Sequence, residues 1–373
     1  MKKIVPMVFL LTSTVFPSCA VSSQKEKAIS PVRVSPMGVN AREPQIAVGK
    51  EGGVWIAYGV ENTIYCAHSS DKGVNFGTPV KVGEAGKLAL GMRRGPRIAV
   101  SGKSLVISAT YGAKGGGADG DLFAWHSEDN GNSWSKPAKV NDVSGAAREG
   151  LHGMAASEKG VFATVWLDLR EKGTQIFASL SRDSGKTWGR NVRVYRSPGG
   201  TVCECCHPSV AFNSEGKLTV MWRNSLRGAR DMYLSTSSDG LTFSSAQKLG
   251  GGTWMLDACP MDGGALGFDT ADQTLTLWRR EQEIFLCSPG KPEQKIGDGI
   301  QGWLAVNGNI PGSLWLTRRG GNLNAQQGEA KSRVLASSAD DPCVASLPGN
   351  GSRFLAVWQT TTEAGSTIYT TSF

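Results

Sequence analysis

Ser127-Glu-Asp-Asn-Gly-Asn-Ser-Trp134 is the stretch that decides the fold, because similar stretches occur at residues 69–76 and 181–188. All three follow the template Ser-x-Asp-x-Gly-x-x-aromatic, and residues 238–243 (Ser-Asp-Gly-Leu-Thr-Phe) carry a degenerate form. In such a turn the aspartate accepts hydrogen bonds from backbone N–H groups, the glycine takes a positive φ angle and the aromatic ring packs beneath the turn. The recurrence predicts similar β-hairpins in successive repeats.

A second repeat accompanies these turns. Arg42-Glu-Pro-Gln-Ile-Ala-Val48 recurs as Arg94-Gly-Pro-Arg-Ile-Ala-Val100, and weaker copies begin at five further positions, namely His152, His207, Gly264, Gly302 and Pro342. Each copy opens a unit of about 40–55 residues, which is the length of a four-stranded propeller blade. We therefore expect an all-β fold consisting of a single β-propeller of four-stranded blades, seven by repeat count, with six as the alternative.

The two ends of the repeat array are each incomplete. The last unit ends at its third strand, residues 367–373, whereas Val32-Arg-Val-Ser-Pro36 resembles a fourth strand with no unit before it. Pairing the two segments removes an open sheet edge. The sequence thus predicts a ring closed by an N-terminal strand that completes the last blade.

The N-terminal segment predicts export. Lys2 and Lys3 precede an apolar run over residues 4–16, and Pro-Ser-Cys-Ala follows at 17–20. This is the arrangement of a signal peptide, and the run is too short to span a membrane. We interpret residues 1–20 as a signal peptide, either plainly cleaved or of the lipoprotein type with Cys19 lipidated, residues 21–31 as a tether, and residues 32–373 as the propeller. The expected location is the periplasm, the outer membrane as a lipoprotein, or outside the cell.

The charge balance favours anionic partners. The chain has 40 Lys and Arg against 32 Asp and Glu, which gives a formal net charge of +8. No run of basic residues marks a nucleic-acid-binding tail, and neither a phosphate-binding loop nor a Gly-x-Ser-x-Gly elbow occurs. We expect an acidic glycan or another anionic small ligand, no nucleic acid, no cofactor, and membrane contact only through a lipid on Cys19.

These features resemble the sialidase-like propellers built from BNR repeats, in which the Ser-x-Asp-x-Gly turns are known as Asp boxes. The resemblance extends over residues 32–373 and implies a propeller whose Asp boxes lie away from the active face. Sialidases of that family have six blades, whereas the repeat count here is seven. The chain is also similar to exported bacterial sialidase-like proteins that carry a Cys-x-Cys-Cys motif and a Cys-Pro-Met-Asp-Gly-Gly motif.

The resemblance further implies an arginine-lined site. Sialidases hold the substrate carboxylate with three arginines and use an aspartic acid as proton donor and a tyrosine paired with a glutamate as nucleophile. Arg42-Glu-Pro44 and Arg94-Gly-Pro96 match the family's Arg-x-Pro motif equally well. The substrate-binding candidates are Arg42, Arg94, Arg148, Arg223 and Arg279. The catalytic candidates are Asp121 or Asp168 as the acid, Tyr58 or Tyr111 as the nucleophile, and His152 for acid–base chemistry.

One departure from the family leaves two functions open. The sialidase acid should follow the first arginine within the first blade, yet no aspartate lies between Arg42 and the first Asp box. The first hypothesis is an exo-α-sialidase or related glycoside hydrolase that acts on acidic sugars. The alternative is a non-catalytic propeller that binds an anionic glycan or a protein through the same face.

A cysteine cluster raises a third possibility. Cys203-Glu-Cys205-Cys206-His207 precedes the fourth unit, and Asp257-Ala-Cys259-Pro-Met-Asp262-Gly-Gly precedes the fifth. Because equivalent loops of adjacent units are neighbours, we expect the two segments to lie close together. Disulfides, a soft-metal site that combines thiolates with His207, His152 or Met261, and redox-active thiols all remain open, and the spacing is not that of a zinc finger or ribbon.

Overall fold

Strands are the only regular secondary structure in the part of the chain that the computed structural model describes, residues 1–3, 30–349 and 353–373. Contacts separate Pro31–Phe373, the unit considered below, from Met1–Ser30. A helix long and apolar enough to cross a membrane is absent from the described residues. The predicted signal peptide, the Cys19 lipid site and nearly all of the predicted tether fall on residues 4–29, outside the described part.

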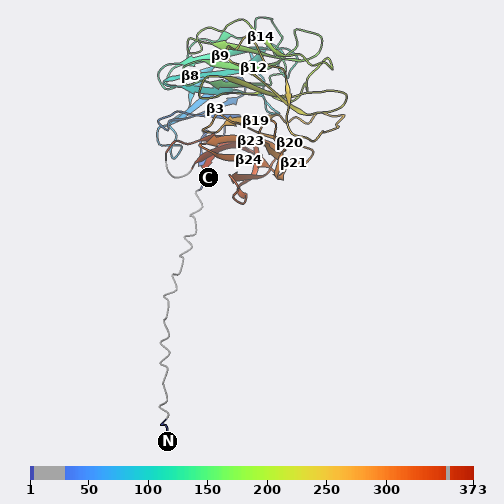
Figure 1. Ribbon diagram of the computed structural model, residues 1–373. Helices are drawn as coiled ribbons and strands as arrows, with labels where there is room; N and C mark the ends of the chain where they lie inside the picture. Colours follow the sequence, from blue (N-terminus) through green and yellow to red (C-terminus); the bar gives the residue numbers. More distant parts are fainter. Residues whose placement is uncertain (4–29, 350–352) are drawn as a thin grey trace. The chain divides into compact units, whose positions relative to one another are not determined.

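The strands form antiparallel sheets in which chain neighbours pair (Figure 1). Four sheets among the described residues have four strands each, in chain order. Their strands are β2 (Ala41–Val48), β3 (Val54–Val60), β4 (Thr63–Ser69) and β5 (Val80–Gly83); β11 (His152–Ala156), β12 (Phe162–Asp168), β13 (Gln175–Ser181) and β14 (Val192–Tyr195); β15 (Ser209–Phe212), β16 (Leu218–Arg223), β17 (Met232–Ser237) and β18 (Gln247–Lys248); β19 (Gly264–Phe268), β20 (Thr274–Arg280), β21 (Glu283–Cys287) and β22 (Gln294–Asp298).

The remaining two sheets in the described residues are variations on this unit. One adds a short strand to four and contains β6 (Lys87–Leu88), β7 (Arg97–Ser101), β8 (Ser104–Gly112), β9 (Asp121–Ser127) and β10 (Ala138–Lys139). The other has seven strands, namely β23 (Ile300–Asn307), β24 (Ile310–Leu316), β25 (Gly321–Gln327), β26 (Arg333–Ser346), β27 (Phe354–Thr362), β28 (Gly365–Ser372) and β1 (Val32–Arg33).

Strand β26 joins two four-strand units in the seven-stranded sheet. Its first half pairs with β25 and its second half with β27, where Cys343 faces Val357. On the far edge, β1 pairs with β28, and Val32 faces Thr370. The segment predicted to complete the last sheet therefore lies on the edge of that sheet.

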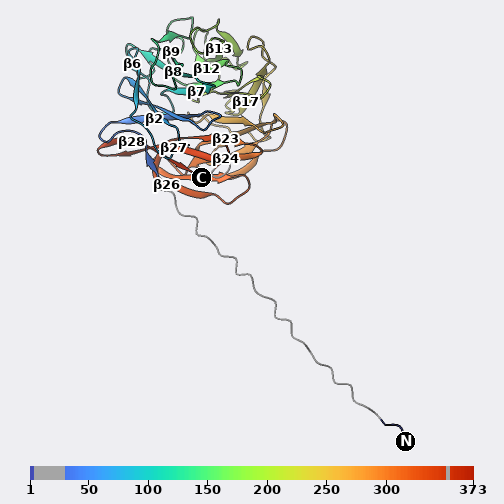
Figure 2. The same ribbon diagram turned by 90° about the vertical axis from the view of Figure 1, so that its left-hand side faces the viewer.

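The first strands of successive units pack against one another. Contacts run from β2 to β7, then to β11, β15, β19, β23 and β26, and β26 in turn contacts β2. Figure 2 shows β2 between β7 and strands β27 and β28, so the beginning and the end of the repeat array are neighbours. The loops that precede the first strands are thus gathered at one place, although they are distant in sequence.

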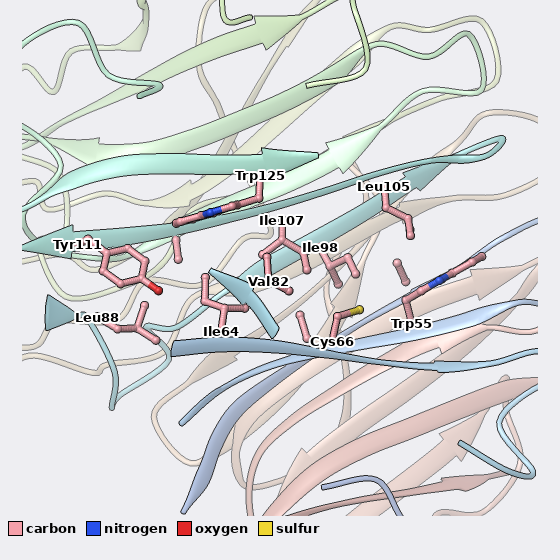
Figure 3. Packing of buried hydrophobic residues seen from close by; sticks show 13 residues of the cluster. Trp55, Ile64, Cys66, Val82, Leu88, Ile98, Leu105, Ile107, Tyr111 and Trp125 are labelled. Carbon is pink, nitrogen blue, oxygen red and sulfur yellow. The ribbon is translucent and has the colours of Figure 1, made fainter. Parts of the chain in front are cut away.

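The hydrophobic core lies in layers between adjacent sheets. In the layer of Figure 3, Trp55 and Cys66 of the first sheet meet Leu105, Ile107 and Trp125 of the next. Burial of these rings and aliphatic groups removes apolar surface from water, which is the main force that holds neighbouring sheets together. Tryptophans recur on the second strand of several units, and the fully buried ones include Trp166, Trp222 and Trp358.

The Ser-x-Asp-x-Gly turns follow the third strand of successive sheets and have the hydrogen bonds expected of them. The Asp129 carboxylate accepts the Ser133 N–H at 2.9 Å, the Ser127 hydroxyl accepts the Gly131 N–H at 2.9 Å, and Gly131 has a φ of 86°. Hydrogen bonds from the Ser133 hydroxyl and backbone lower the pKa of Asp129 to about 2. Asp71 and Asp183 cap their turns in the same way.

Candidate functional site

A narrow cavity of about 170 Å³ lies where the first strands meet. All seven first strands contribute to its lining, through residues that include Gln45, Arg97, His152, Ser209, Leu266, Trp303 and Cys343. Pockets that bury a small-molecule ligand usually measure about 300–1,000 Å³. The central cavity is therefore too small to enclose an oligosaccharide, and a ligand of that size must lie outside it.

The first strands and the loops that precede them bring charged and polar side chains together at one end of this cavity. We call this end the mouth and define it by Glu43, Arg93, Arg97, His207, Asp262, Gln301, Trp303 and Asp341. The Arg93 guanidinium lies 4.7 Å from the centroid of the Trp303 ring, and the His207 ring stacks on the same indole at 5.4 Å. Because these three residues come from the second, sixth and fourth units, their side chains join distant units.

Two buried carboxyl groups, those of Glu43 and Asp262, belong to the mouth. Their residues are only 2% and 1% exposed. Burial raises the pKa of both, and the nearby Asp341 raises that of Glu43 further, against the opposing effect of Arg93. The Gln301 N–H donates to Asp262 Oδ2 at 2.7 Å, whereas Glu43 Oε1 and Asp262 Oδ1 have no hydrogen-bond partner among the described residues.

A recurring backbone conformation leads into the mouth. The residue two positions before a cavity-lining residue takes a positive φ in three units, at Glu43 (56°), Gln301 (54°) and Asp341 (47°), and glycines with positive φ occupy the same place at Gly95 and Gly150. A residue with a side chain costs roughly 1–2 kcal/mol in this conformation, and such strain gathers at functional sites. In the first two units this position is the middle residue of the Arg-x-Pro motif. Gln301 occupies the same place relative to the repeat that begins at Gly302, and this is the signal that could have identified it.

Arg223, a predicted substrate-binding residue, is instead a structural clamp. It is 1% exposed, and its guanidinium donates to the carbonyl oxygens of Asp262 at 3.2 Å, Arg230 at 2.7 Å and Arg279 at 2.8 Å. All three nitrogens are thus engaged by the backbone. Arg279 is more accessible, with its Nη1 3.9 Å from Asp262 Oδ2 and its side chain over the Trp254 ring.

Three of the predicted catalytic side chains lie in the packed interior. Tyr58 is 1% exposed and stacks on Tyr65, and burial raises the pKa of its hydroxyl. Tyr111 is also 1% exposed, and its hydroxyl donates to the Asn62 carbonyl at 3.1 Å. His152 lines the central cavity but is wholly buried, with Nε2 3.0 Å from the Ser108 hydroxyl, and burial lowers its pKa to about 3.

The two predicted acids serve neighbouring loops. Asp168 is fully buried and accepts hydrogen bonds from the Trp166 indole at 2.7 Å and from Arg170. Asp121 pairs with Lys139 at 2.8 Å and accepts the Gly145 N–H at 2.6 Å. Both carboxylates therefore accept several hydrogen bonds from the loops around them.

The other three predicted arginines lie close to one another. Arg94 Nε donates to the Glu149 carbonyl at 2.6 Å, next to Arg148, and Arg42 Nη2 lies beside Gly91, whose carbonyl accepts a hydrogen bond from Arg94. We call Arg42, Arg94 and Arg148 the rim arginines. Within the described residues, Arg94 lies 3.9 Å from Glu149, whereas Arg42 and Arg148 make no ion pair this close and act on Glu43 and Glu149 at longer range.

A groove of about 450 Å³ opens beside Arg148. Its other walls come from the loop at residues 143–146, the loop at residues 169–174, and Glu204. These loops belong to the same end of the sheets as the mouth. The volume falls within the range of small-ligand pockets, so this groove, rather than the central cavity, has room for a sugar.

The predicted cysteine cluster is present, without His207. Cys203 Sγ lies 3.7 Å from Cys205 Sγ and 3.4 Å from Cys206 Sγ, and Met261 packs against the three thiols. These separations exceed the about 2.05 Å of a disulfide bond, and the cysteines of the described part are free thiols. The His207 ring lies on Trp303 at the mouth instead.

Comparison with protein families supports a repeat propeller. The model of the BNR repeat-like domain matches residues 96–254. No curated protein sequence matches the chain.

Solved structures share the fold at low sequence identity. An α-L-arabinanase of Penicillium chrysogenum, in complex with arabinobiose, is 13% identical and aligns over 93% of this chain and 98% of its own with a TM-score of 0.56. The Hadza microbial sialidase Hz136 is 16% identical over 90% of this chain and 66% of its own, with a TM-score of 0.53. An ulvan lyase bound to -[GlcA(1-4)Rha3S]- is 10% identical over 92% and 96%, with a TM-score of 0.59. At these identities the similarity establishes the propeller-type all-β fold alone.

Proposed function

We propose that this chain is a carbohydrate-active propeller that binds an acidic sugar at the rim arginines, with the sugar ring in the groove beside Arg148. The observation that carries the proposal is the pair of guanidinium groups, Arg42 and Arg148, that make no close ion pair among the described residues and act on Glu43 and Glu149 only at longer range. A guanidinium binds a carboxylate through two parallel hydrogen bonds, which gives both affinity and orientation. Proteins of the same fold include enzymes named for acidic and neutral glycans, which agrees with this use.

Glycoside hydrolysis is the activity we infer at this site. Glu43 follows Arg42 directly, and its buried carboxyl group keeps a proton at a higher pH than an exposed glutamate does. A carboxyl group with a raised pKa is the usual proton donor to a leaving-group oxygen. Exo-α-sialidase activity is the specific form to test first, with Arg42 on the substrate carboxylate and without Arg223, whose nitrogens are bound to backbone carbonyls.

A non-catalytic glycan-binding module is the second candidate. The observation that favours it is that the side chains predicted for catalysis, those of Tyr58, Tyr111, His152, Asp121 and Asp168, are all occupied by structural contacts. The rim arginines serve this function equally well. Under both candidates we propose that the seven units close into one ring and that residues 1–20 direct export, which the adjacency of β2 and β26 and the composition of the N-terminus support.

Sugar release by the purified protein tests these proposals. The substrates are a fluorogenic sialoside and a panel of uronic-acid glycosides, and binding of the free acidic sugars is measured by calorimetry. We expect release that is lost in Arg42→Ala and Arg148→Ala but kept in Arg190→Ala, an exposed arginine beside the turn of residues 181–188. Binding without release would select the non-catalytic module. Absence of both binding and release would overturn the assignment of the rim arginines. An equal loss of release in Arg190→Ala would overturn it as well.

A further inference from the structure

The two cysteine-bearing loops are held side by side by one residue. The Arg223 carbonyl accepts the Cys203 N–H at 3.0 Å, and the Arg223 guanidinium donates to the Asp262 carbonyl at 3.2 Å. Glycine packing fixes the second loop as well, because a Cβ on Gly263 would lie 2.3 Å from the His207 carbonyl oxygen. The Cys-Pro-Met-Asp-Gly-Gly segment is therefore anchored against the Cys-x-Cys-Cys segment at both the clamp and the glycine.

Sulfur atoms gather where the loops meet. The thiols of Cys203, Cys205 and Cys206 all lie within 4.8 Å of one another, and their residues are 0%, 8% and 1% exposed. Cys259 is exposed to solvent and lies outside this group of three, and its side chain acts on Cys205. The Met261 thioether packs against the three buried thiols. No carboxylate or imidazole belongs to this group in the described residues.

We propose that Cys203, Cys205 and Cys206 bind a thiophilic metal ion with a filled d shell, copper(I) or zinc(II), and that Cys259 is the residue through which the site opens to solvent. This site is independent of the glycan function proposed above. Sulfur-only donor sets select such soft or borderline ions over magnesium, calcium or manganese, which prefer oxygen.

The spacing of the thiols agrees with a shared ion. A Zn–S bond of about 2.3 Å and a tetrahedral angle place two coordinated sulfurs about 3.8 Å apart. The separations of 3.7 Å and 3.4 Å in this structure are close to that value. Two of the three sulfur pairs are thus nearly in place and the third lies within 4.8 Å, so binding needs side-chain rotations and no movement of the loops. A disulfide would instead require one pair to approach to about 2.05 Å and would leave the third buried thiol unpaired.

The surrounding charges favour coordinated thiolates. Metal binding removes the thiol protons, so three buried ligands bring up to three negative charges into the site. Arg223 acts electrostatically on Cys203 and Cys206, Arg230 acts on Cys203, and Arg279 interacts with Cys206. These guanidinium groups offset the negative charge that coordination creates. This role explains why basic residues surround a buried cluster that contains no carboxylate.

Metal titration of the reduced, metal-free full chain tests the proposal. Zinc(II) is added in competition with a chromophoric chelator, and copper(I) is added without oxygen in competition with a copper(I)-specific chelator. We expect one ion per chain. Cys203→Ser should weaken binding by more than about 100-fold, since loss of even an outer-shell partner costs about 10–100-fold. Cys287→Ser, which changes a buried thiol of β21 outside the cluster, should leave the affinity unchanged.

The Cys259→Ser variant distinguishes zinc(II) from copper(I). Because Cys259 is exposed, this substitution should leave folding intact, so a change in affinity reports on the metal site. If zinc(II) is the ion, Cys259 supplies the fourth tetrahedral ligand, and the variant should lose affinity and one sulfur-to-cobalt charge-transfer contribution when cobalt(II) replaces zinc. If copper(I) is the ion, three ligands suffice and the variant should bind as the parent does. Absence of binding to the reduced chain, equal binding by Cys203→Ser, or disulfides within the cluster that resist mild reductants in peptide mapping would each overturn the proposal.

Discussion

The turn edge, formed by the Ser-x-Asp-x-Gly turns, and the mouth both carry carboxylates near the ends of strands, yet these carboxylates have opposite properties. At the turn edge Asp129 is exposed, and its donors lie within four residues of it in the chain, so its pKa falls to about 2. At the mouth Glu43 and Asp262 are buried and their pKa values rise; the Glu43 N–H donates to the Gln359 side chain 316 residues away, and the Asp262 carboxylate accepts the Gln301 N–H 39 residues away. The turn edge is thus specified locally, whereas the mouth exists only when distant units have come together.

Arg223→Met should have the largest effect on stability, because the clamp belongs entirely to the long-range side of this comparison. The variant leaves three carbonyl groups without their donor in a buried place. Loss of one partner from a buried charged network typically costs about 3–5 kcal/mol. Urea unfolding followed by tryptophan fluorescence measures the change.

A matched control is available in the loop that follows β16. Arg227 is exposed, and Arg227→Met should change the free energy of unfolding by less than about 0.5 kcal/mol. Equal stability of the two variants would mean that Arg223 is not a clamp, and it would restore Arg223 as a candidate for ligand binding.

The same contrast explains how much could be predicted from the sequence. The turns were predicted with their hydrogen bonds, because Ser127, Asp129 and Gly131 determine that geometry among themselves. The four-strand units and the proximity of the two cysteine loops followed from the repeat. The roles of Arg223 and Asp168 could not be predicted, because an arginine that binds a ligand and one that binds backbone carbonyls look alike until the folded chain supplies the partners.

Glu43→Gln should have the next largest effect, and it depends on pH. A carboxyl group whose pKa is raised by folding contributes its stability below its ordinary value of 4.5 and loses it as the pH rises through the raised value. The parent should therefore lose stability relative to Glu43→Gln between about pH 5 and pH 8, by more than about 1 kcal/mol. Chemical unfolding of both proteins at several pH values measures the difference. A gap that stays constant with pH would contradict the burial of an ionisable group at the mouth.

Asp129→Ala should have the smallest effect and the opposite dependence on pH. Removal of one capping carboxylate from an exposed turn costs about 0.5–1 kcal/mol near neutrality. Because folding lowers this pKa, the stabilisation is present above its ordinary value of 3.8 and is lost as the pH falls through about 2. The difference between parent and variant should therefore vanish in acid, whereas Lys136→Ala, an exposed change beyond the same turn, should show no difference at any pH. If Asp129→Ala instead cost as much as Arg223→Met, the turn edge would support contacts between units, and the division between a local edge and a long-range mouth would fail.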